Sequence, residues 1–116
     1  MSDNSVDLKD FSIAEKRISF KVDDDIFDAY TVLSIPAMQD LVLLSKDISK
    51  LVENENYEPI LKIFDVLLSE KSAARFRERL SAKNGDDALD LRRQVIPILH
   101  YLLERYGLRP TQQLSD

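Results

Sequence analysis

The sequence predicts a mainly α-helical protein in which a small N-terminal β-hairpin packs on a bundle of about four helices. Apolar and polar residues alternate over a short stretch near residue 20, which is typical of a half-buried strand. From Ser34 onward, apolar residues recur at three- and four-residue spacing, as on one face of a helix. The last of these segments has the widest apolar arc, which indicates a central helix contacted from two sides.

The chain of 116 residues has the length of a single domain. Residues 1–16 are mainly polar and charged, and we expect them to form a flexible N-terminal arm. Residues 17–107 are expected to form one helical domain that includes the hairpin. Residues 108–116 are expected to form a flexible tail, because Gly107 can end a helix and Pro110 cannot continue one.

The predicted hairpin begins with the alternating segment RISFKV, whose apolar members are Ile18, Phe20 and Val22. Three aspartates at positions 23–25 suit a tight turn, and the residues that follow as far as Val32 favour a strand. An isolated hairpin is only marginally stable, so this one is expected to pack against the helices.

Three helices are expected between the hairpin and residue 82. Pro36 suits the first turn of a helix that starts near Ser34, and the polar run ENEN ends that helix. Ser69 is a candidate N-cap for the third helix, EKSAARFRERLSA. The apolar faces of the three helices consist of Met38, Leu41, Val42, Ser45, Ile48 and Val52; of Tyr57, Ile60, Leu61, Phe64, Leu67 and Leu68; and of Ala73, Phe76 and Leu80.

The last helix is expected over about residues 87–106. Asp86 or Asp87 is the predicted N-cap, and Asp90 in the first turn suits the positive end of the helix dipole. Pro97 lies inside this helix, where its missing N–H predicts a kink.

The composition excludes several classes of function. A net charge of −5 and a pI of about 4.9 argue against duplex DNA and anionic membranes as partners. The absence of cysteine excludes disulfides and thiolate metal sites and fits a reducing cytoplasm. No apolar run is long enough to span a membrane. We therefore expect a cytoplasmic protein without cofactors.

Residues with catalytic or metal-binding chemistry are few. The aspartates at 23–25 offer oxygen ligands, but no EF-hand spacing follows, so a solvated turn is favoured over a cation site. His100 lies at the edge of an apolar arc, and no motif supplies a nucleophile or carboxylate for it. Only Gly85 and Gly107 are glycines, so a glycine-rich phosphate loop is excluded. An interaction protein is favoured over an enzyme.

The third helix is basic within an acidic protein. Arg75 and Arg79 are one turn apart and share a face, which predicts a docking patch for an acidic partner or nucleic acid. The alternative is a solvated helix face whose arginines pair with Glu70, Glu78 and other nearby acids. A DNA-recognition helix at RFRERL is disfavoured by the net charge.

Three helical residues do not fit the apolar and polar faces of their helices. Leu43 and Val66 point away from the main apolar stripes of their helices and are candidates for a partner-binding or self-association patch. Arg92 falls within the apolar arc of the last helix, where its charged end must snorkel to water or meet a carboxylate. The candidate partner-binding residues are Leu43, Val66, Arg75, Phe76 and Arg79.

Two segments, ILKIFDVLLSEKSAARFRERL and VIPILHYLLERYGLRPTQQLSD, resemble the tail assembly chaperones of long-tailed bacteriophages, especially those of actinobacterial hosts. The likeness covers most of residues 18–116, but residues 36–56 do not match closely and the tail is shorter and poorer in serine. The matching positions are Phe64, Leu68, Ser69, Ala73, Ala74, Phe76, Arg77 and Leu80, then Ile96, Pro97, Tyr106, Gly107, Arg109, Pro110 and Thr111.

This resemblance implies a non-catalytic protein of the host cytoplasm that binds the tape measure protein, keeps it soluble and is absent from the finished virion. It also implies a longer form, made by ribosomal frameshifting, that recruits the tail tube protein. Residues 108–116 would then link the domain to the extension. Self-association into a homo-oligomer is a further hypothesis. The main alternative function is a small structural virion protein, such as a head–tail connector.

Overall fold

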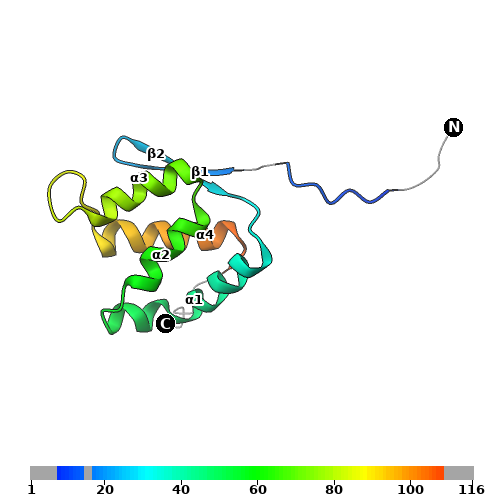
Figure 1. Ribbon diagram of the computed structural model, residues 1–116. Coiled ribbons are helices and arrows are strands. Elements are labelled where there is room, and N and C mark those ends of the chain that lie inside the picture. Colours follow the sequence, from blue (N-terminus) through cyan, green and yellow to red (C-terminus); the bar gives the residue numbers. More distant parts are fainter. Residues whose placement is uncertain (1–7, 15–16, 109–116) are drawn as a thin grey trace.

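The computed structural model describes residues 8–14 and 17–108. It confirms the predicted class, because an N-terminal antiparallel hairpin is followed by a mainly helical chain (Figure 1). The described elements are, in chain order, β1 (Arg17–Val22), β2 (Asp25–Tyr30), α1 (Ile35–Glu53), α2 (Glu58–Leu67), α3 (Glu70–Ser81), a π-helical turn η1 (Leu91–Val95) and α4 (Ile96–Arg105).

The predicted arm and tail are described only in part. Residues 8–14 are in neither a helix nor a strand, and residues 1–7 and 15–16 of the arm lie outside the described residues. Only Leu108 of the tail is described. Gly107 ends α4 as predicted, with a φ of +81°, and the N–H of Leu108 donates to the carbonyl of Leu103 at 2.8 Å.

The hairpin turns at Asp23 and Asp24, so that Val22 faces Asp25 and Phe20 faces Phe27. Asp23 has a φ of +55°, a left-handed conformation that aspartate adopts more readily than most residues. The outer edge of β2 is covered by the start of α3. There the N–H of Ser69 donates to the carbonyl of Asp28 at 2.8 Å, and the N–H of Asp28 donates to Ser72 Oγ at 2.8 Å.

Phenylalanine rings join the hairpin to the helices. Phe76 of α3 contacts Phe27 of β2 edge-to-face at 5.2 Å between ring centroids, and it contacts Phe64 of α2 at 4.6 Å. Phe20 stacks on Phe27 at 5.4 Å. These rings bury large apolar areas, and their pairing adds to the stabilisation from burial. Phe76 is fully buried and therefore belongs to the core, so it is not available as a partner-binding residue.

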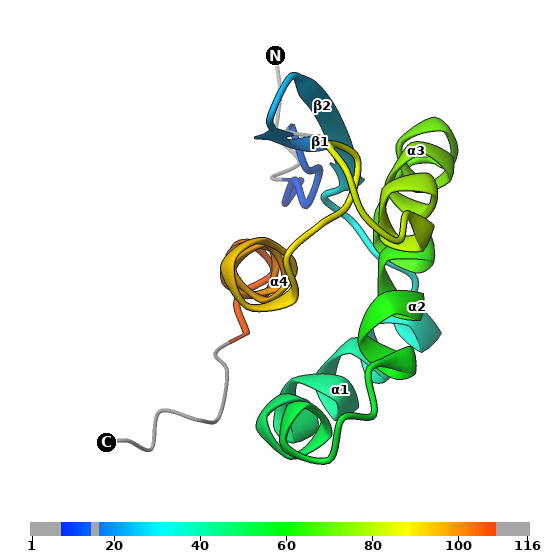
Figure 2. The ribbon, with the colours of Figure 1, turned by 90° about the vertical axis from the view of Figure 1, so that its left-hand side faces the viewer.

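The hairpin, α3, α2 and α1 form an arc, and α4 runs along the inside of that arc (Figure 2). The side of α4 that faces the other elements carries Leu99, Leu102 and Leu103, which are fully buried. Tyr106 at its end donates a hydrogen bond of 2.6 Å to the carbonyl of Tyr30, and burial raises the pKa of Tyr106 to about 12. The expectation of a central last helix is consistent with this arrangement.

The last helix begins later than predicted. Residues 82–90 form a loop, and the helical segment starts at Leu91 rather than near residue 87. Its N-cap is Asp90, whose carboxylate accepts from the N–H of Arg93 at 2.8 Å, instead of Asp86 or Asp87. Arg79 donates hydrogen bonds to the backbone carbonyls of both Asp86 and Asp87. These two residues are held in the loop by these bonds and do not form the first turn of the helix.

Pro97 lies in the first turn of α4, directly after the π-helical turn. In that turn the N–H of Ile96 donates to the carbonyl of Leu91, five residues earlier. Pro97 lacks an N–H and cannot continue a regular α-helical pattern. The sequence predicts a kink at Pro97; the structure has a change from π-helical to α-helical hydrogen bonding directly before this residue.

Candidate functional site

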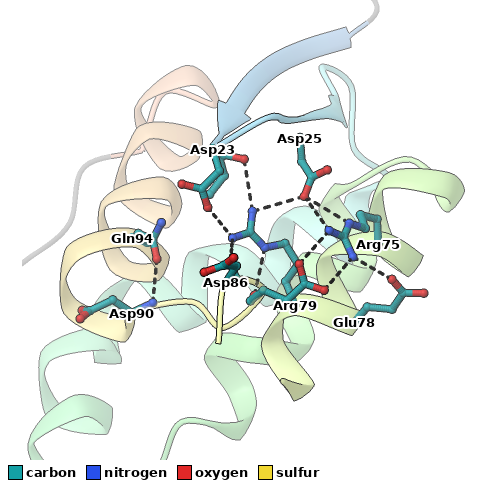
Figure 3. Close-up of polar contacts among 10 residues, drawn as sticks. Asp23, Asp25, Arg75, Glu78, Arg79, Asp86, Asp90 and Gln94 are labelled. Atoms are coloured by element: carbon teal, nitrogen blue, oxygen red, sulfur yellow. Dashed lines mark hydrogen bonds and ion pairs between the residues drawn. The ribbon is translucent and has the colours of Figure 1, made fainter. Parts of the chain in front are cut away.

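Arg79 lies on the inner side of α3, and only 2% of its surface is exposed. Its guanidinium joins three parts of the chain that are distant in sequence (Figure 3). Toward the loop before the last helix, it donates from Nε to the carbonyl of Asp87 at 3.0 Å and from Nη2 to the carbonyl of Asp86 at 3.3 Å. Toward the hairpin, it donates from Nη1 to the carbonyl of Val22 at 3.2 Å and to Asp25 Oδ2 at 3.3 Å, and from Nη2 to Asp23 Oδ2.

These contacts correct the prediction that Arg79 forms part of a surface patch. A buried charge is tolerated only when it is paired and hydrogen-bonded, and here Asp23 and Asp25 neutralise the guanidinium. The planar group with its several fixed donors suits arginine and not lysine. Two of the three aspartates at 23–25 thus anchor a buried arginine, which is a structural role that the sequence did not indicate.

Arg75 is partly exposed, but its charge is matched by acidic side chains. It pairs with Asp25 at 3.1 Å, with Glu78 at 3.0 Å and with Asp87 at 3.1 Å. Hydrogen bonds to Asp87, Glu78 and Asp25 raise the pKa of Arg75, and the same contact with Arg75 lowers the pKa of Asp87. Arg75 therefore fits the alternative interpretation of the third helix, in which its arginines pair with nearby acidic side chains.

The other two candidate partner-binding residues are exposed. Leu43 on α1 is 62% exposed and Val66 on α2 is 40% exposed. Exposure leaves both residues available to a partner, but single apolar side chains at a surface are common. A larger apolar surface provides a stronger argument for binding.

Such a surface runs along α1. Successive turns place six residues at heptad spacing, alternately three and four apart, which is the pattern of a helix that packs along another helix. The core side of α1 is formed by Leu41, Leu44, Ser45 and Ile48, so Ser45 belongs to both stripes. We call the second stripe the α1 seam; its residues are Ile35, Met38, Val42, Ser45, Ser49 and Val52.

The α1 seam is partly open to solvent, because Ser45 is buried and Val52 packs against the core. Ile35 and Ser49 are exposed, and Met38, Val42 and Val52 are half-buried. A hollow of about 520 Å³ lies at the N-terminal half of α1, and the seam residues Ile35, Met38 and Val42 line it together with Leu43.

A second hollow, of about 470 Å³, lies between the C-terminal half of α1 and the start of the last helix. We call it the α1–α4 groove. Its apolar lining comes from Ile48 and Val52 on one side and Ile96 on the other, and its charged residues are Glu53 and Arg92. The lining residues are Ile48, Ser49, Val52, Glu53, Arg92, Ile96 and His100.

The groove explains two residues that were unusual in the sequence. Arg92 is exposed and lines the groove, so its charge reaches solvent beside the apolar surface of the last helix. Burial lowers the pKa of His100, although the charge of Glu104 opposes this. His100 is therefore mainly uncharged at neutral pH. The groove offers apolar contacts with one cation and one anion at its edge, which suits an amphipathic helix.

Among the residues that the structure describes, no group of three or more histidine, aspartate or glutamate side chains is placed to hold a metal ion. None of the described helices has both the length and the apolar character needed to cross a membrane.

Comparisons with protein-family models, with curated proteins and with solved structures each gave no match to this chain.

Replacing the buried arginine should destabilise the fold. Arg79→Met leaves three backbone carbonyls without their donor and removes one partner each from Asp23 and Asp25, which should lower the free energy of unfolding by about 3 kcal/mol. Arg77→Met is the matched control on the same helix, because Arg77 is exposed and pairs with Asp65 at the surface; its cost should stay below about 1 kcal/mol. Urea unfolding measures both, and equal costs would contradict the anchoring role of Arg79.

The contact between Arg75 and Asp87 should make stability depend on pH in acid. The hydrogen bonds and charge of Arg75 hold the pKa of Asp87 below 3.8 in the folded protein. Its contribution is therefore present above about pH 4, where the unfolded-state carboxyl ionises, and is lost as the pH falls through the lower, folded pKa. The urea midpoints of wild type and Asp87→Asn should differ at pH 7, with wild type higher, and converge by about pH 2. A gap that stays constant over this range would contradict the assignment.

Proposed function

We propose that this chain is a tail assembly chaperone of a long-tailed bacteriophage and that its client is the tape measure protein. The proposal rests on the resemblance of residues 18–116 to that family and on one structural observation, the α1 seam. The seam is a partly open stripe at heptad spacing on a helix of 19 residues, and four of its six residues are apolar. A helix of this length extends over about 28 Å, enough to contact several turns of a client helix.

The physical task of such a chaperone fits a surface of this kind. A very long amphipathic chain aggregates through its apolar faces until its assembly partners cover them. A small domain that offers one apolar seam can cover a short length of the client, and many copies can act along one chain. Each contact can be weak, because neighbouring sites on the same client act together.

The proposed function also implies a location for the protein and a longer form of it. It places the chain in the host cytoplasm during assembly, without catalytic activity, and leaves it out of the finished virion. It assigns residues 108–116 as the connection to a C-terminal extension in a longer, frameshifted form that recruits the tail tube protein. The exposed Leu43, Val66 and Arg75 define an alternative client-binding surface, which the same experiment tests.

Co-expression with the tape measure protein of the same genome tests the function and the surface together. Val42→Lys places a charge in the α1 seam. Leu43→Lys places the same charge on the adjacent residue, which lines the same hollow but lies outside the heptad stripe and is 62% exposed, so its charge can stay in water. We expect wild type and Leu43→Lys to keep the client soluble. Val42→Lys should recover less of it, by about tenfold or more, because a lysine charge must then be buried against apolar surface.

The outcomes separate the alternatives. Circular dichroism of each variant first establishes that the fold is intact. Loss of the client with Leu43→Lys alone would move the binding surface to the exposed face that includes Val66 and Arg75. A client that stays insoluble beside well-folded wild type would contradict the chaperone function, and detection of this chain in purified virions would then favour a connector.

A further inference from the structure

The N-terminal arm carries apolar residues that its own domain does not cover. Residues 8–14 extend away from the helices (Figure 1). Within them Phe11 is 80% exposed and Ile13 is 45% exposed. Phe11 and Ile13 are two apart, so they share one face of an extended strand, with Asp10 and Ser12 on the other face. This pattern is that of a strand with one apolar face and no sheet to join.

In the part of the chain that the structure describes, the outer edge of β1 pairs with no further strand. A two-residue turn places the hydrogen-bonded pairs of the hairpin at Val22, Phe20 and Ile18 of β1. The backbone groups of Ser19 and Lys21 therefore point away from β2. The hydroxyl of Tyr101 confirms this direction, because it donates to the carbonyl of Ser19 at 3.5 Å, the outer limit of a hydrogen bond. An unpaired strand edge is a template for pairing with another strand.

An apolar hollow lies beside this edge. It occupies about 360 Å³ between β1 and the last helix, and its apolar lining comes from Phe20, Pro97, Ile98 and Tyr101. Lys21 and Arg93 add positive charge at its rim. In residues 9–14 of the arm, Asp10 is the one acidic residue and Lys9 the one basic residue. Asp10 is therefore the residue of this segment whose charge is complementary to Lys21 or Arg93.

We propose that two copies of this chain exchange their arms, with residues 9–14 of each copy pairing as an antiparallel strand with the outer edge of β1 of the other. One register matches the apolar residues of the arm with those of β1, with Lys9 opposite Val22 at the end of the pairing; to form it, the Ser12 N–H gives up its bond to Asp10 Oδ1 and the Ser19 carbonyl its contact with Tyr101. Ser12 faces Ser19 as a hydrogen-bonded pair, Phe11 and Ile13 lie on the buried face of the sheet beside Phe20 and Ile18, and Asp10 faces Lys21.

The connection to β1 favours exchange between copies over folding back in one copy. In that register, a single chain would have to reverse direction at positions 15 and 16, which are Glu and Lys. Two-residue hairpin turns need left-handed backbone conformations that glycine and asparagine supply and that Glu-Lys does not favour. Exchange needs no reversal, and a two-fold axis makes both contacts equivalent. The inference is independent of the proposed client.

Successive residues of the arm lie on opposite faces of the proposed strand, so variants on each face test the dimer by sedimentation equilibrium of the full chain. The double variant Phe11→Ser/Ile13→Ser removes the apolar face of the arm and should weaken the dimer by about tenfold or more. Leu8→Ser is the control in the arm, because this register places Leu8 on the opposite face, and Ile26→Ser is the control on the exposed face of the hairpin. Both controls should dimerise like wild type.

A second variant tests the strand edge itself. Ser19→Pro removes an N–H that points away from β2, so the hairpin should remain while the edge can no longer pair. We expect a folded monomer by circular dichroism and sedimentation. A monomeric wild type would overturn the inference, and so would a dimer that survives both the Phe11→Ser/Ile13→Ser change and Ser19→Pro.

Discussion

The buried guanidinium of Arg79 is the interaction on which the rest of the structure depends. It joins the hairpin turn to α3 and to the loop before the last helix, through Val22, the turn aspartates and the carbonyls of Asp86 and Asp87. A hairpin of two short strands is not stable alone, and the loop at 82–90 contains no regular element, so both need an anchor. The phenylalanine cluster supplies apolar burial on the same side of α3, while Arg79 fixes the relative placement of the three segments.

The α1–α4 groove, which the seam residues Ser49 and Val52 line, and the β1 edge proposed to accept the arm both depend on this placement. The loop that Arg79 holds sets the start of the last helix, whose residues Arg92 and Ile96 form one side of the α1–α4 groove. The hairpin turn that it holds sets the distance between β1 and the same helix, where the second apolar hollow lies. One face of the last helix packs into the core, and its remaining sides contribute to two separate grooves. The last helix thus lines two apolar hollows, one shared with α1 and one shared with β1.

The period of apolar residues was enough to predict the hairpin, the helices and their order, because local geometry determines which side chains share a face. Burial of Arg79 could not be predicted in this way, since its partners come from positions about 55 residues earlier and about eight later. The same contacts hold Asp86 and Asp87 in the loop, so the last helix begins at Leu91, although both aspartates are good N-cap residues by their local sequence. On α1, the apolar stripe was visible, but its division into a core side and a partly open seam required the positions of α2 and α4.

Amide hydrogen exchange of the Arg79→Lys variant, followed by mass spectrometry, tests most directly whether one buried group holds the three segments together. Lysine keeps the charge but has a single nitrogen, so it cannot reach the hairpin turn and the two loop carbonyls at once. The account predicts that amides of β1, β2 and residues 82–95 exchange about tenfold faster or more, while those of α1 and α2 keep their wild-type rates. Unchanged exchange in the hairpin and the loop, or an equal increase throughout the chain, would contradict it.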